Sequence, residues 1–129
     1  MNKKILIIED NEQNMYMLTY LLESYEYAVI QAFTGADGIR IAGETVPVAI
    51  LLDIQLPEMD GYTVARNLRM MRTLDPVPII AVTSYAMVGD REKVMESGAD
   101  GYIEKPIDPD TFVQQMESII AEKRNSWHG

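Results

Sequence analysis

The chain contains no cysteine, and this absence excludes a disulfide framework, a thiol nucleophile and a cysteine-ligated zinc site. It also agrees with a cytoplasmic location. Basic residues are scarce, since 11 Lys and Arg stand against 20 Asp and Glu and give a formal net charge of −9. Because such a field repels nucleic acid and anionic lipid, we expect neither nucleic acid nor membrane as a direct partner.

Long hydrophobic runs are absent as well. No apolar stretch approaches the length of about 20 residues that spans a bilayer, and the apolar run after Lys4 is too short for a signal-peptide core. The 129 residues fit one domain. We assign residues 1–124 to this domain and residues 125–129, which include His128, to a flexible C-terminal tail.

What the sequence does contain is a regular alternation of two hydrophobic patterns. Aliphatic and β-branched runs predict strands at residues 5–8, 27–33, 48–52, 77–82 and 102–103. One-sided apolar patterns follow each run and predict five helices, the last of which begins at Pro109 with Asp108 as its cap. The alternation predicts an α/β fold, namely a doubly wound, five-stranded parallel sheet with five helices on its two faces.

Polar side chains follow four of the predicted strands, at the point where each strand ends. Glu9 and Asp10 come after the first run, Asp53 after the central one, Thr83 after the fourth and Lys105 after the fifth. The carboxyl ends of parallel strands form the crevice in which open α/β sheets bind ligands. We therefore expect these five side chains to meet at one edge of the sheet.

Three carboxylates at one edge repel one another unless a cation is present or one of them holds a proton. Mg²⁺ is the natural partner, because it prefers oxygen ligands and keeps positions open for phosphate. Lys105 and Thr83 supply the donors that phosphoryl oxygens need. Asp53, on the central strand, is the best-placed nucleophile for an acyl phosphate.

With these motifs in place, the chain resembles the receiver domains of two-component response regulators. The motifs are Glu9-Asp10, Asp53 in a Leu-Asp-Ile-Gln-Leu-Pro segment with Asp60-Gly61 behind it, Thr83-Ser84, and Lys105-Pro106. The resemblance runs from Lys3 to about Lys123 and implies the flavodoxin-like receiver fold. The Asp-Asn-Glu-x-Asn opening at residues 10–14 is similar to that of single-domain cell-fate and polarity regulators and of hybrid-kinase receivers.

The resemblance implies a role for each carboxylate. Asp53 would be the phosphoacceptor. Asp10, Asp53 and the backbone carbonyl of Gln55 would bind Mg²⁺, and Glu9 would act on the metal through water. The side chain at position 55 is one place where the family varies its rate of dephosphorylation.

The resemblance also implies a switch. Thr83 would bond the phosphoryl group and turn inward, which would draw Tyr102 from an exposed to a buried rotamer. Lys105 would pair with the phosphate, and the peptide bond between Lys105 and Pro106 would be cis, an isomer that proline permits. Tyr85, beside the switch hydroxyls, could either contact a partner or pack inward.

The expected function is that of a phosphorylation switch. A sensor histidine kinase or histidine phosphotransfer protein would donate its phosphoryl group to Asp53, and the surface around the fourth helix, fifth strand and fifth helix would change partners. Met1 lies directly before the first strand and no effector domain follows the last helix. We therefore expect a single-domain regulator that signals to a downstream protein effector or a further relay step, and that performs no enzymatic reaction beyond its own phosphoryl transfer and autodephosphorylation.

Two other functions fit parts of the pattern. A magnesium-dependent phosphatase with an aspartyl nucleophile would usually carry a second acid two residues later, where Gln55 stands. A flavodoxin-like cofactor module would need a glycine- and hydroxyl-rich loop after the first strand, where acidic residues would repel a cofactor phosphate.

Met15, at the start of the first helix, could border the crevice where a partner helix docks.

Overall fold

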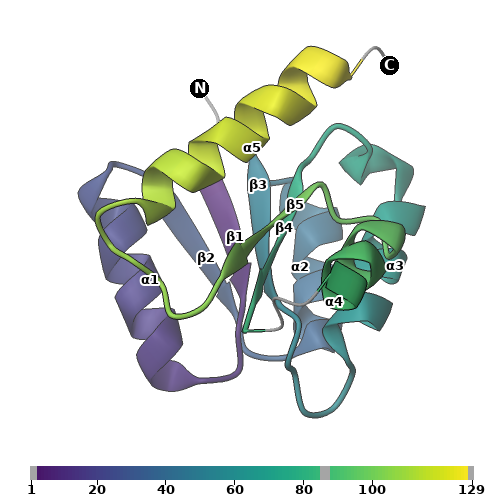
Figure 1. Ribbon diagram of the computed structural model, residues 1–129, viewed down its shortest axis with the longest axis horizontal. Helices are drawn as coiled ribbons and strands as arrows, with labels where there is room; N and C mark the ends of the chain where they lie inside the picture. The colour runs from purple at the N-terminus through teal and green to yellow at the C-terminus, as the bar shows by residue number, and fades with distance from the viewer. Residues whose placement is uncertain (1–2, 85–87, 128–129) are drawn as a thin grey trace.

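The computed structural model describes residues 3–84 and 88–127 of the chain and contains one five-stranded sheet (Figure 1). Its strands are β1 (Lys4–Ile8), β2 (Ala28–Ala32), β3 (Ala49–Asp53), β4 (Ile79–Thr83) and β5 (Gly101–Glu104). Every neighbouring pair is parallel, and the order is β2-β1-β3-β4-β5. The predicted doubly wound parallel sheet is confirmed.

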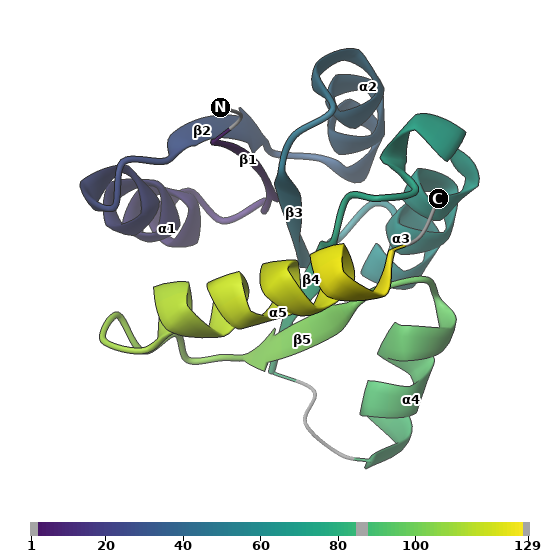
Figure 2. The same ribbon diagram turned by 90° about the horizontal axis from the view of Figure 1, so that it is seen from above.

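The helices cover both faces of the sheet. They are α1 (Glu12–Ser24), α2 (Gly35–Thr45), α3 (Gly61–Met70), α4 (Val88–Glu96) and α5 (Phe112–Ser126), with a short 3₁₀ turn, η1 (Arg72–Leu74). Figure 2 shows α1 and α5 on one side of the sheet and α2, α3 and α4 on the other. In the described part of the chain, no helix combines the length and the apolar character that crossing a membrane would require.

The central strands explain why the hydrophobic runs in the sequence are continuous rather than alternating. Ile5 and Ile7 of β1 pack into the core beneath α1 and α5, whereas Leu6 and Ile8 pack into the core beneath α2, α3 and α4. All four are 0 to 1% exposed. A strand buried on both faces needs apolar side chains at every position, and this double burial fixes its carboxyl end beneath the site.

Within the residues that the structure describes, three helices begin with side-chain caps. Asn11, Thr34 and Asp60 precede α1, α2 and α3, and each accepts a hydrogen bond from the backbone N–H three residues later, at 2.9, 3.1 and 2.9 Å. Such caps satisfy N–H groups that have no partner within the helix. They fix the starts of α1 and α3, the helices that follow the two strands whose ends carry the acidic residues.

The predicted start of the last helix is wrong. α5 begins at Phe112, not at Pro109, and Thr111 occupies the cap position. The Asp108 side chain accepts instead from the N–H of Asp110 at 2.9 Å, while its backbone oxygen accepts from Phe112 at 2.9 Å. An aspartate can stabilise a turn as readily as a helix start, and here the turn over residues 108–111 comes first.

Other boundaries also differ from the prediction. β3 and β4 extend to Asp53 and Thr83, so these site residues are the last residues of their strands rather than the first residues of loops. α5 continues through Ser126, so Asn125 and Ser126 of the predicted tail are helical. Residues 128 and 129 lie outside the described residues, and a domain boundary after residue 124 stays a prediction.

Candidate functional site

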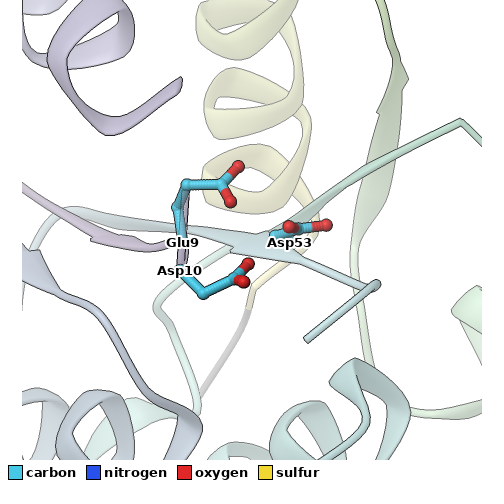
Figure 3. A group of neighbouring side chains, drawn as sticks. All are labelled: Glu9, Asp10 and Asp53. Carbon is cyan, nitrogen blue, oxygen red and sulfur yellow. The ribbon is translucent and has the colours of Figure 1, made fainter. Parts of the chain in front are cut away.

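Three carboxylates meet at the carboxyl edge of the sheet (Figure 3). Glu9 and Asp10 follow β1, Asp53 ends β3, and one oxygen from each of the three lies within 4.8 Å of the others. The cause is the register of the two neighbouring strands, which places Ile8 beside Leu52 and therefore Glu9 beside Asp53. The structure thus brings together the acidic residues that the sequence predicted.

Lys105 completes this cluster from the end of β5. Its Nζ lies 3.3 Å from Asp53 Oδ1 and 3.6 Å from Glu9 Oε1. Its backbone N–H donates to the carbonyl oxygen of Thr83 at 2.9 Å, so the ends of β4 and β5 are held together at the site. The peptide bond between Lys105 and Pro106 is cis.

Glu9 and Asp10 are adjacent in sequence but lie in different environments. Glu9 is buried at 2% exposure, whereas Asp10 is exposed. Burial, and next a hydrogen bond with Asp53, raise the pKa of Glu9 to about 7, although the N–H of Asn11 and the charge of Lys105 act in the opposite direction. The cluster brings three carboxylates to one lysine, and its oxygen donors fit a hard divalent cation such as Mg²⁺.

Asp53 is held in place by the loop that follows β3. Its Oδ1 accepts from the backbone N–H of Gln55 at 2.9 Å, and the carboxylate is 4% exposed. The N–H of Gly61 donates to the carbonyl of Ile54 at 3.0 Å, and a Cβ at position 61 would overlap the Ile54 backbone. Gly61 therefore positions the loop behind Asp53. The motif alone did not reveal why glycine is needed here, which is the close contact with the Ile54 backbone.

A hydrogen bond that the sequence did not predict spans the mouth of the site. The Ser84 hydroxyl donates to Oε1 of Gln55 at 2.8 Å and joins the loops after β3 and β4. Both side chains are exposed. The role of the Gln55 carbonyl as a metal ligand stays a prediction.

The two predicted switch residues lie on neighbouring strands. Thr83 is fully buried, and Tyr102 is half-buried against the core beneath α2, α3 and α4. The guanidinium carbon of Arg91, on α4, lies 5.1 Å from the centre of the Tyr102 ring, and Arg91 also pairs with Glu104 at 3.0 Å. The sequence did not predict the contact of Arg91 with Tyr102, because no sequence pattern links Arg91 to β5. Tyr85 lies outside the described residues.

A cavity of about 410 Å³ opens beside the cluster, between α1 and the loop after β5. Glu9 and Lys105 line it together with Asn14 and Met17 of α1. Met15, which was expected to border this crevice, is only 1% exposed and belongs to the core beneath α1 and α5. The expectation for Met15 was wrong, because Asn14, Met17 and Leu18 are the residues of α1 that line the cavity.

A parallel sheet in this order, with carboxylates and a lysine at its carboxyl edge, defines an α/β domain of the receiver type. The sequence profile of the response regulator receiver domain matches residues 5–117. The chain belongs to this family.

Individual relatives agree with the family match. The polar-differentiation response regulator DivK of Brucella ovis is 38% identical over 122 residues, which cover 95% of this chain and 99% of DivK. The solved receiver domain of sensor histidine kinase PA1611 from Pseudomonas aeruginosa PAO1, described with a magnesium ion coordinated in its active-site cleft, is 33% identical with a TM-score of 0.85; the match covers 94% of this chain and 99% of that one. The chemotaxis protein CheY4 of Vibrio cholerae, 23% identical with a TM-score of 0.88 and coverage of 92% and 99%, shows the same fold. The predicted resemblance to polarity regulators and kinase receivers is confirmed.

Proposed function

We propose that Asp53 accepts a phosphoryl group from a phosphohistidine of a sensor histidine kinase or a histidine phosphotransfer protein. The observation that carries this proposal is the position of Lys105 Nζ, 3.3 Å from Asp53 within a cluster of three carboxylates. A lysine and a carboxylate cluster of this kind match the needs of phosphoryl transfer, which depends on positioning and on charge stabilisation.

In the proposed reaction a carboxylate oxygen of Asp53 forms a bond to phosphorus. The bond between phosphorus and the donor imidazole nitrogen breaks, and the electron pair of that bond returns to the imidazole. Lys105 lies close enough to Asp53 to pair with an oxygen of the transferred group. The Gln55 N–H, at 2.9 Å from Oδ1, orients the Asp53 carboxylate.

Asp10, Asp53 and the carbonyl of Gln55 would hold Mg²⁺, and Glu9 would contact it through water. When bound, the ion supplies positive charge to the phosphoryl oxygens. The juxtaposition of Glu9, Asp10 and Asp53, with one oxygen of each within 4.8 Å of the others, supports this assignment, because oxygen donors in such a group suit a hard divalent cation.

The proposed output is a change in the surface formed by α4, β5 and α5, with Thr83 and Tyr102 as its moving parts and a downstream protein as its reader. The contact between Arg91 and Tyr102 supports a coupling of α4 to this change. A phosphatase is less well supported, because the side chain of Gln55 is a neutral amide that bonds Ser84.

The test is incubation with acetyl phosphate and Mg²⁺ followed by intact mass measurement. We expect one base-labile phosphoryl adduct on the wild type and none on Asp53→Asn. Asp37→Asn on α2, an exposed carboxylate outside the cluster, is the matched control and should label like the wild type. An adduct that persists on Asp53→Asn would refute the assignment of Asp53.

A further inference from the structure

The outward face of α1 carries an unusual set of exposed side chains. Tyr16 and Tyr20 are 72% and 69% exposed, and Glu12 and Glu23, also exposed, flank them along the helix. These four residues are here named the α1 stripe. Large aromatic side chains exposed this far contribute little to the fold and are typical of interaction surfaces.

The two tyrosines form an ordered pair. They are one helical turn apart, and their rings stack with centroids 6.5 Å apart and an angle of 21° between the planes. Tyrosine loses little conformational entropy when it is fixed in an interface, and a pair that is already stacked loses less. Tyr16 and Tyr20 are thus suited to be the energetic centre of a contact.

The charge of the α1 stripe specifies the chemistry of what binds it. No Lys or Arg occurs between residues 12 and 24, and within residues 3–84 and 88–127 neither Glu12 nor Glu23 takes part in a salt bridge. Aromatic faces and uncompensated carboxylates both attract cations. They repel anionic lipid and nucleic acid, so the complementary partner is a basic protein segment.

The α1 stripe is separate from the phosphoacceptor site. A different side of α1, through Asn14, Met17 and Leu18, lines the cavity that Glu9 and Lys105 share. Tyr16 and Tyr20 do not line that cavity. A partner on the stripe would therefore leave the mouth of the Asp53 site open.

We propose that the α1 stripe docks a basic helix of a partner protein, whose arginine side chains stack on Tyr16 and Tyr20 and pair with Glu12 and Glu23. Arginine fits better than lysine because its planar guanidinium stacks on aromatic rings while it bonds a carboxylate. Arginines four residues apart on the partner helix match the spacing of Tyr16 and Tyr20. The contact goes beyond the proposed phosphoryl transfer and does not require it.

The test uses a synthetic alanine-rich helical peptide with two arginines four residues apart, and matched peptides with lysine or glutamate at those positions. Amide chemical shifts of the ¹⁵N-labelled full chain report where each peptide binds. We expect the arginine peptide to shift amides of α1, the lysine peptide to bind about threefold more weakly, and the glutamate peptide not to bind.

Variants of the chain separate the stripe from general attraction to an acidic protein. Tyr16→Ser combined with Tyr20→Ser should weaken arginine-peptide binding about tenfold, whereas Tyr25→Ser, at a tyrosine 50% exposed beyond the end of α1, should not. Glu12→Lys with Glu23→Lys should abolish binding. Glu92→Lys with Glu96→Lys changes the net charge equally on α4 and should leave most of the binding intact.

Three results would overturn the proposal. The first is that no amide shifts at millimolar peptide. The second is that amides shift over the whole surface and that the α4 control loses as much binding as Glu12→Lys with Glu23→Lys. The third is self-association of the chain that requires Tyr16 and Tyr20, because a second copy would then be the occupant. Asp53→Asn should bind the peptide like the wild type. Failure of phosphoryl transfer and failure of the stripe are therefore observed in different experiments.

Discussion

Replacement of Glu9 by glutamine tests the electrostatics of the carboxylate cluster without metal. Glu9 is 2% exposed, and burial together with Asp53 raises its pKa from 4.5 to about 7. Between these two pH values the folded protein holds a proton that the unfolded chain has released. The contribution of Glu9 to stability is therefore most favourable below pH 4.5, falls as the pH rises, and reaches a lower plateau above pH 7.

The magnitude follows from the difference between 4.5 and about 7, which is about 2.5. At about 1.4 kcal/mol for each pKa unit, the raised pKa of Glu9 lowers the free energy of unfolding by about 3 kcal/mol at pH 8, where Glu9 is ionised in both states. At pH 5 the loss is about 1 kcal/mol, because only the unfolded chain has released most of the proton. Glutamine has nearly the same shape and stays neutral. We expect Glu9→Gln to be more stable than the wild type by about these amounts.

The assay is urea unfolding followed by far-UV circular dichroism from pH 5 to pH 8, with a chelator present. Glu122→Gln, at an exposed glutamate of α5, is the control and should follow the wild type at every pH. Added Mg²⁺ at pH 8 should stabilise the wild type more than Glu9→Gln, because the cation offsets the negative charge of ionised Glu9, which the glutamine variant lacks. Parallel stability profiles for Glu9→Gln and the wild type would refute the reasoning.

Two further substitutions test the positioning of the sheet and of the loop behind Asp53. Asp100→Ala should lower the free energy of unfolding by about 3 kcal/mol, since it leaves the partly buried Arg69 and Lys123 without their carboxylate. A loss below about 1 kcal/mol would show instead that the two ion pairs behave like surface pairs. Gly61→Ala should lower the free energy of unfolding by about 2 kcal/mol, because the added methyl group would overlap the Ile54 backbone. Phosphorylation by acetyl phosphate should also slow. Urea unfolding like that of the wild type would contradict the close contact.

The sheet and the cluster were predictable because both depend on local patterns. A strand buried on both faces must be apolar throughout, so β1, β3 and β4 are visible as continuous runs, and a polar residue directly after such a run falls at the ligand-binding edge. Asp53 and Thr83 could therefore be placed with their neighbours from position alone. That Glu9 is buried while Asp10 is exposed could not, since this depends on how the chain turns from β1 into α1.

Contacts between segments far apart in sequence were not predictable. The bond from Ser84 to Gln55 spans 29 residues, and the pair of Arg91 with Glu104 spans 13. Both depend on the rotamers of exposed polar side chains, for which no periodic pattern exists. The late start of α5 has a similar cause, because Asp108 has two competing local bonds and only the tertiary structure selects the turn.

The ion pairs around β5 are unequally buried, and this difference indicates that α4 is less firmly attached than the rest of the domain. At the amino end Asp100 accepts from Arg69 and from Lys123, each at 2.8 Å, with all three side chains at most 23% exposed. At the site end α4 is joined to β5 by Arg91 and Glu104, which are 44% and 47% exposed. An exposed pair contributes less than about 1 kcal/mol, whereas breaking a buried network costs several. We therefore expect native-state hydrogen exchange to open α4 well before β4 and α5, and Arg91→Ala to speed exchange in α4 alone; equal protection of α4 and α5 would contradict this graded attachment.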